Sequence, residues 1–260
     1  MGSEMCIRDR NMLRIWNAIL IMLTFALTIF GTFLTRSGVM SSVHSFTESS
    51  LGPIFLAFVA IIVTVCAVLI FHVLPNLKSN KHIESLTSRE SGFLFNNVVF
   101  VTMCFAVFWG TIFPVISEAV RGTKITVGPP FFNQVNVPIG LLLLMLTGVG
   151  PLLAWRRTSR SNFIKYFSIP IGLALIAAVV FLLSGLRGYV VISLMLSVFV
   201  VVAIVTEFKR GVHARMNRFG ESSFEAFRTM VRKNRSRYGG YFVHLGIVLM
   251  FIGLLARLLI

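Results

Sequence analysis

Five histidines are the side chains of this sequence with the widest chemical scope, because a neutral imidazole ligates metal ions and exchanges protons near neutral pH. No Cys/His metal spacing occurs among them, and the three cysteines form no CxxC pair. His82 and His213 fall in basic segments, and His72 lies near the end of an apolar run. We interpret these three histidines as solvated or interfacial residues.

The other two histidines are stronger candidates for a site. His244 is surrounded by apolar residues in the last apolar run, where little water reaches it, and an ionisable group there is a functional-site hypothesis by default. It either ligates a metal or haem, or it makes an interhelical hydrogen bond that Gly239, Gly240 and Gly246 would permit through close helix approach. His44 follows the first apolar run and either ligates iron or is solvated.

Composition shows what must position these histidines. Of the 260 residues, 56% are apolar and 13% charged, and the mean hydropathy is +0.87, which excludes a soluble globular domain and a disordered chain. No phosphate-binding loop and no Ser/His/Asp pattern is present. The sequence predicts an all-α polytopic transmembrane helix bundle of about seven spans. The apolar runs are roughly 15–34, 52–75, 93–117, 136–155, 166–184, 189–207 and 240–259.

The distribution of Lys and Arg between the loops predicts the topology. Nineteen of the 24 lie in the amino-terminal tail and the second, fourth and sixth connections, which is the pattern of cytoplasmic segments. We therefore expect a cytoplasmic amino terminus and a periplasmic carboxyl terminus. The net charge of +15 is then explained by basic loops beside an anionic lipid bilayer, and we expect no nucleic-acid partner.

The domain organisation is expected to be simple. Residues 1–10 are polar and unlike the apolar run after them, so we interpret them as a non-native or remnant tail before a single transmembrane domain at 11–260. A basic cytoplasmic loop is expected at 208–238 and is long enough for a short helix on the membrane surface. Its apolar residues recur at near-helical spacing: Phe219, Phe224, Phe227 and Met230.

Four segments in order along the chain resemble one known family. The run GTFLTRSGVMSSVHSF at 31–46 is similar to the signature loop of the CcmF family, the large membrane subunit of the bacterial cytochrome c haem lyase. SRESGFLFNN at 88–97 resembles that family's approach to a span, and GTIFP followed by KITVGPPFFN, between residues 110 and 133, resembles its next outer loop. RYGGYFVHLG at 237–246 is similar to the segment that carries one of its intramembrane haem ligands.

The resemblance implies a role in cytochrome c maturation. A haem lyase of this family takes haem from a periplasmic haem chaperone and attaches it through thioether bonds to apocytochrome c, with other maturation subunits of the inner membrane. His44 would match one of two periplasmic histidines that ligate the incoming haem. His244 would match one of two membrane histidines that hold a resident haem b, proposed in the family to reduce the incoming one. Because the predicted topology puts His44 outside and His244 toward the cytoplasmic side, the two histidines would serve different haems.

Three outer-face cations, Arg36, Arg121 and Lys124, would either pair haem propionates or be ordinary loop charges. Pro129 and Pro130 favour an extended outer loop beside them.

The sequence departs from the family pattern in what it lacks. The family's tryptophan-rich haem platform and its other haem-ligating histidines have no counterpart here, so we expect a fragment with little or no lyase activity alone. The alternatives are a polytopic permease or exporter subunit and a structural membrane assembly partner. Against a permease, the sequence has no buried acidic pair, and Glu118 and Glu207 lie near span ends.

Overall fold

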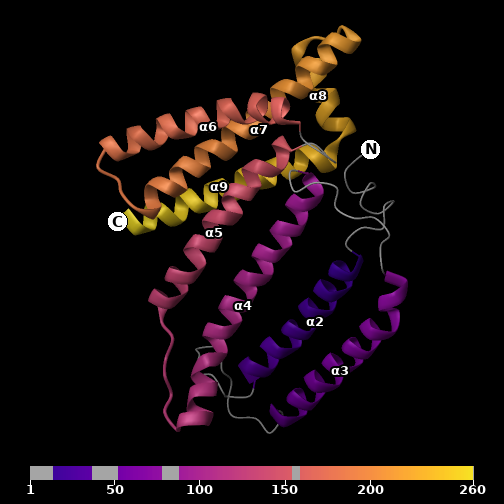
Figure 1. Ribbon diagram of the computed structural model, residues 1–260, viewed down its shortest axis with the longest axis vertical. Coiled ribbons are helices and arrows are strands. Elements are labelled where there is room, and N and C mark those ends of the chain that lie inside the picture. Colours follow the sequence, from indigo (N-terminus) through magenta and orange to yellow (C-terminus); the bar gives the residue numbers. More distant parts are fainter. Residues whose placement is uncertain (1–13, 37–51, 78–87, 154–158, 260) are drawn as a thin grey trace. The chain divides into compact units, whose positions relative to one another are not determined.

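The computed structural model describes residues 14–36, 52–77, 88–153 and 159–259, and every regular element within them is an α-helix (Figure 1). The helices are α2 (Arg14–Arg36), α3 (Gly52–Leu77), α4 (Arg89–Arg121), α5 (Pro129–Leu152), α6 (Arg160–Leu183), α7 (Tyr189–Phe219), α8 (Ser223–Lys233) and α9 (Arg235–Leu259). All of these except α8 are long and apolar enough to cross a membrane. The predicted all-α, polytopic membrane architecture is confirmed, and the side on which each terminus lies stays a prediction.

The hydropathy pattern locates the seven membrane helices but underestimates the length of several. α5 begins at Pro129 rather than near residue 136, and α7 continues to Phe219 rather than ending near residue 207. Pro129 and Pro130, expected in an extended loop, occupy the first turn of α5 instead. Proline fits there because its fixed φ suits a helix and the missing N–H would have had no intrahelical acceptor.

The basic segment 208–238 is helical over most of its length. α7 ends at Phe219, and Gly220 after it adopts the left-handed conformation at φ +65° that glycine accepts without strain. The Ser222 side chain then accepts a hydrogen bond from the backbone N–H of Glu225, whose carboxylate accepts one from the Ser222 N–H, and this capping box starts α8. α8 is a short helix within this segment and carries Phe224, Phe227 and Met230, but Phe219, expected on the same helix, is the last residue of α7. The position of α8 on a membrane surface stays a prediction.

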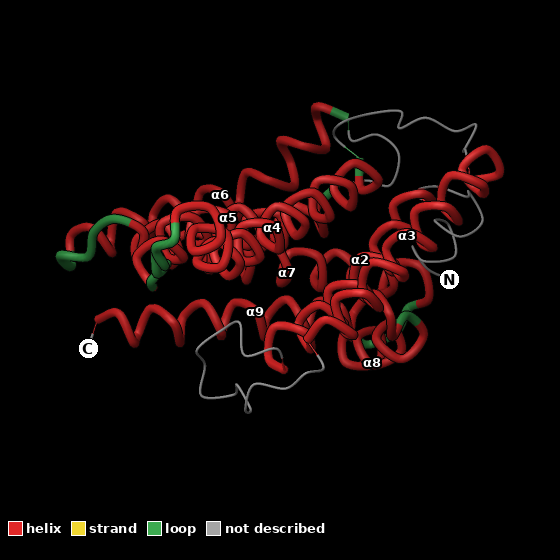
Figure 2. The backbone as a smooth tube through the Cα atoms, turned by 90° about the horizontal axis from the view of Figure 1, so that it is seen from below, coloured by secondary structure: helices red, strands yellow, loops and turns green. Residues whose placement is uncertain are grey.

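The described helices divide between two compact units. In one, α2 packs against α3, and the part of α4 from residue 112 belongs to the same unit. The other contains the first part of α4, up to residue 111, and α5 to α9. In this larger unit α7 packs against α5, α6, α8 and α9, so it forms the centre of the packing (Figure 2).

The larger unit has a tightly packed core where α5 meets α7. Leu144, Val200 and Ala203 are fully buried there. A Cβ added at Gly148 would lie 2.6 Å from Phe199 Cε1, so only glycine lets the phenylalanine ring approach the α5 backbone in this way. This contact fixes α5 against α7 one residue away from Thr147, which lines a cavity beside His244.

Candidate functional site

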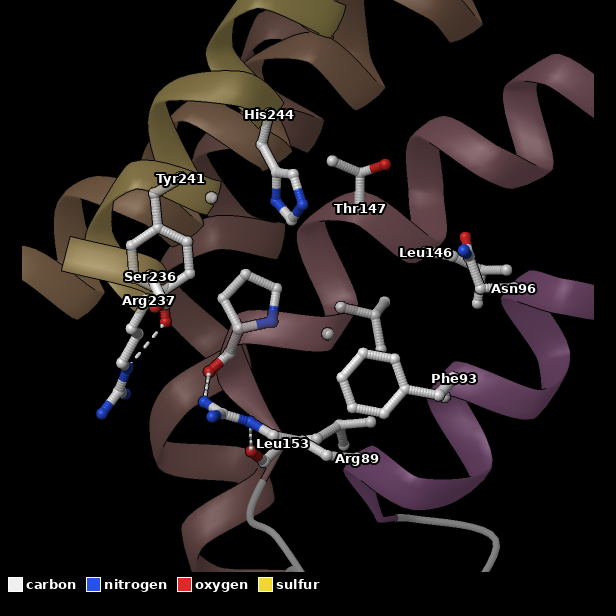
Figure 3. Close-up of a pocket in the computed structure, with 15 residues that line it drawn as sticks. Arg89, Phe93, Asn96, Leu146, Thr147, Leu153, Ser236, Arg237, Tyr241 and His244 are labelled. Atoms are coloured by element: carbon white, nitrogen blue, oxygen red, sulfur yellow. Dashed lines mark hydrogen bonds between the residues drawn. The ribbon is translucent and has the colours of Figure 1, made fainter. Parts of the chain in front are cut away.

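His244 lies on the face of α9 that it shares with Arg237 and Tyr241, because residues separated by four and then three positions stack along one side of a helix. Its imidazole points into a cavity between α4, α5 and α9 (Figure 3). The Nδ1 atom is buried and has no hydrogen-bond partner within the described residues. Nδ1 therefore does not make the interhelical hydrogen bond that the sequence left open.

The cavity beside His244 measures about 240 Å³. Phe93 and Asn96 of α4, Thr147 and Pro151 of α5, and Tyr241 of α9 contribute to its wall. Pockets that enclose a drug-sized ligand usually begin at ~300 Å³, so this cavity would enclose one edge of a large cofactor rather than all of it. The whole cavity belongs to the larger compact unit.

Glycines line the cavity and leave room in it, whereas the sequence suggested that glycines near His244 allow close helix approach. Gly239, Gly240 and Gly246 were expected to allow close helix approach, but a Cβ added at any of the three would meet no atom within 4 Å. The close-approach interpretation is therefore wrong for the described structure. Gly240 and Gly150 line the cavity, and their missing side chains leave it open.

A buried ion-pair network lies next to the cavity. Glu207 of α7 is only 2% exposed, and Arg237 Nη2 donates to its Oε2 at 2.8 Å while Arg210 pairs with the other carboxylate oxygen. Arg237 Nε also donates to the Tyr241 hydroxyl at 3.2 Å. Burying a carboxylate is costly unless it is paired and hydrogen-bonded, so this arrangement favours one register of α9 against α7. The sequence shows only that Glu207 lies near the end of a span. It does not reveal the pairing with Arg237, because no local pattern indicates a partner 30 residues away.

Arg89, at the start of α4, closes one end of the cavity. Its Nε donates to the carbonyl of Leu153 and its Nη2 to the carbonyl of Pro151, both at 2.7 Å. These carbonyls belong to the last turn of α5 and the residue after it, where backbone acceptors have no intrahelical donor. Burial lowers the pKa of Arg89, yet guanidinium groups in proteins stay protonated, so a positive charge is held at this end of the cavity.

Of the remaining predicted residues, none with a described side chain is among those that line this cavity. His44 lies outside the described residues, and Arg36 ends α2 with a side chain that is not described. Arg121 and Lys124 are exposed and belong to the other compact unit. His72 and His213 are exposed, and their solvated or interfacial position stays a prediction. Among the described residues, no group of three or more His, Cys, Asp or Glu side chains could hold a metal ion.

The chain is similar to curated proteins over nearly all of its length. It is 32% identical over 258 residues to the cytochrome c-type biogenesis protein CycK of Rhizobium meliloti, covering 97% of this chain and 37% of that protein. It is 30% identical to the cytochrome c-type biogenesis protein CcmF of Haemophilus influenzae, covering 94% of this chain and 37% of that protein. It is 31% identical to the cytochrome c-type biogenesis protein CcmF of Pseudomonas aeruginosa, covering 94% of this chain and 36% of that protein.

The chain thus spans little more than a third of the length of the curated relatives it matches. No protein-family profile matches it. No solved structure gives a significant match.

Proposed function

This chain belongs to the CcmF family of cytochrome c-type biogenesis proteins, and from that premise we propose that it is a membrane portion of a cytochrome c haem lyase. In this proposal the complete protein receives haem from a periplasmic haem chaperone and takes part in its covalent attachment to apocytochrome c. Seven apolar helices support a multi-pass membrane location, and we propose the bacterial inner membrane. The amino terminus would be cytoplasmic, as the distribution of Lys and Arg predicts.

His244 is the residue that we assign to a resident haem b. The observation that carries this assignment is a buried imidazole nitrogen with no hydrogen-bond partner among the described residues, facing a cavity that glycines keep open. A neutral imidazole supplies the lone pair that an axial haem ligand needs. The residues present therefore fit one face and one edge of a haem.

A bound haem supplies one-electron chemistry at its iron, and the residues of this chain would position it. The Tyr241 ring lies 6.3 Å from the His244 ring and limits its movement on one side. Phe93, Leu146 and Leu153 line the cavity and would exclude water from the haem edge. No second histidine lines the cavity within the described structure, so any further ligand to the iron would come from elsewhere.

His44 remains our proposed ligand for the incoming, periplasmic haem. Arg36, Arg121 and Lys124 would be the cations that pair with the propionates of that haem. Arg121 and Lys124 are exposed, so their charges are available to a ligand that arrives from water. On the predicted topology this periplasmic site and the His244 site would hold separate haems.

The test of the His244 assignment is haem binding by the purified chain in vesicles of phosphatidylcholine, titrated with haemin and followed by absorbance. We expect His244→Ala to weaken binding ~10-fold or more, because even outer-shell changes at metal sites commonly cost that much. His213→Ala is the matched control, since His213 is exposed, and it should leave the affinity unchanged. Equal affinities for the wild type and His244→Ala would refute the assignment.

A further inference from the structure

The end of the cavity opposite His244 carries more positive than negative charge. Arg89 interacts electrostatically with Arg237, Arg210 and Glu207, and these four groups comprise three guanidiniums and one carboxylate. Among the described residues, the hydrogen bonds of Arg89 go to neutral carbonyls and not to Glu207, so Glu207 does not neutralise it directly. Two positive charges are thus left in excess among the described side chains of this cluster.

Both arginines that line the cavity have N–H donors that their described hydrogen bonds do not use. Arg89 uses Nε and Nη2 on the α5 carbonyls, and Arg237 uses Nε on Tyr241 and Nη2 on Glu207. A guanidinium has five N–H donors, so the Nη1 group of each arginine is not used by any of these bonds. Guanidinium donors that no described residue uses, beside an apolar wall, suit the oxyanion of an amphiphilic molecule.

The arginines are also at a suitable place relative to His244. Arg237 precedes His244 by two helical turns on the same face of α9, which corresponds to ~10 Å along the axis. Figure 3 shows Arg89 and Arg237 at one end of the lining residues and His244 at the other. This separation is of the order of that between the iron of a haem and its propionate edge.

We propose that Arg89 and Arg237 form an oxyanion-binding edge of the His244 cavity that holds the propionate groups of the haem. This proposal rests on the proposed haem function and adds to it the residues that orient the ring. Arg89 and Arg237 would hold the propionates, and His244 would be the residue that ligates the iron. The phosphate of an anionic lipid offers the same oxyanion chemistry, and the experiment separates the two.

The test compares haemin with haemin dimethyl ester, which keeps the iron but has no free carboxylates. Binding is measured by absorbance for the whole chain in phosphatidylcholine vesicles. The binding that remains in His244→Ala is subtracted, so that only binding that depends on His244 is compared. We expect the wild type to bind haemin ~10-fold more tightly than the ester, as charge-assisted hydrogen bonds imply. Arg89→Gln and the double variant Glu207→Gln/Arg237→Gln should lower haemin affinity toward that of the ester and leave ester binding unchanged.

The double variant avoids an unpaired buried Glu207, and unchanged ester binding through His244 shows that its cavity is still formed. Arg228→Gln, which removes an exposed charge on α8, is the matched control and should keep the preference. Equal binding of haemin and ester through His244 would overturn the oxyanion edge while leaving the His244 assignment intact. No His244-dependent binding of either compound would instead refute the proposed haem site itself.

Vesicles containing phosphatidylglycerol test the lipid source. If a lipid phosphate rather than a propionate occupied the edge, adding phosphatidylglycerol would change haemin and ester binding equally in the wild type and neither in Arg89→Gln, which would overturn the propionate assignment. We expect the preference for haemin over its ester to persist in both kinds of vesicle.

Discussion

Arg237 Nη2 of α9 donates a 2.8 Å hydrogen bond to Glu207 Oε2 of α7, two helical turns before His244. This contact couples the candidate haem ligand to the helix at the centre of the larger unit, because Arg237 and His244 share one face of α9. The pair therefore sets the position from which His244 faces its cavity.

Replacing one partner of this ion pair should destabilise the protein more than replacing both partners. We expect Glu207→Gln to lower the free energy of unfolding by about 1–3 kcal/mol, less than for a fully buried pair because the Arg237 side chain is 39% exposed. The double variant Glu207→Gln/Arg237→Gln should recover part of the loss. Thermal unfolding of the chain in detergent measures both, and a double variant less stable than the single one would contradict this view.

Filling the cavity without disturbing the protein should weaken haem binding alone. Gly240→Leu places a side chain in open space that borders the site, since a Cβ there meets no atom within 4 Å. Replacing a helical glycine also favours the helix by up to ~1 kcal/mol, so stability should not fall. The affinity for haemin should decrease.

Gly239→Leu is the control for this experiment. Gly239 is the neighbouring residue, is equally open and does not line the cavity. Its replacement should leave haemin affinity as it is. If both variants bound haemin like the wild type, the described cavity would not be the haem site.

The packing of α5 on α7 depends on Gly148. Gly148→Ala would put a Cβ 2.6 Å from the Phe199 ring and 3.1 Å from Val200 Cγ2, and overpacking of this kind costs ~1–3 kcal/mol. Gly172→Ala on α6 is the control because it meets nothing within 4 Å. Adding Phe199→Leu should relieve the strain, and thermal unfolding that shows Gly148→Ala as stable as Gly172→Ala would argue against this contact.

A pH effect is expected where α7 meets α8. Arg215 Nη2 donates to Glu221 Oε1 at 2.7 Å, and this hydrogen bonding holds the pKa of Glu221 below its ordinary value. The stabilisation is complete above the unfolded pKa, about 4.3, and is lost as pH falls through the lower folded pKa. Amide exchange in α8 should therefore be faster in Glu221→Gln than in the wild type at pH 7.

That difference in exchange should shrink as the solution is acidified through the folded pKa of Glu221. Arg215→Gln should give the same profile as Glu221→Gln, because either change removes the same pair. Exchange rates in α8 that differ from wild type by a constant factor from pH 7 to pH 3 would show that Glu221 ionisation has no part in the effect.

The sequence predicts the membrane helices well because a span requires an unbroken apolar run, which is a local property. It does not predict the extension of α7 beyond residue 207, since residues such as Phe208 and Val212 pack partly against the core while the rest of that stretch is polar. The loop predicted at Pro129 is wrong because proline favours both extended chain and the first turn of a helix.

His244 is evident from the sequence because an imidazole in an apolar run is conspicuous on its own. Glu207 and Arg89 are not, because their roles depend on partners 30 and more than 60 residues away, which no local pattern indicates. The open space beside Gly240 is likewise a property of the packed structure. From the sequence alone, a glycine near His244 suggests close helix approach, which the structure does not show there.

Haem ligation by His244 is tested most directly by removing its ring and returning it in solution. The chain with His244→Gly is mixed with haemin in phosphatidylcholine vesicles, reduced, and its absorbance and Fe–imidazole Raman band are recorded with and without added imidazole. We expect the histidine-ligated spectrum of the wild type to disappear and to return when imidazole is added. A wild-type spectrum in His244→Gly without imidazole would contradict the assignment.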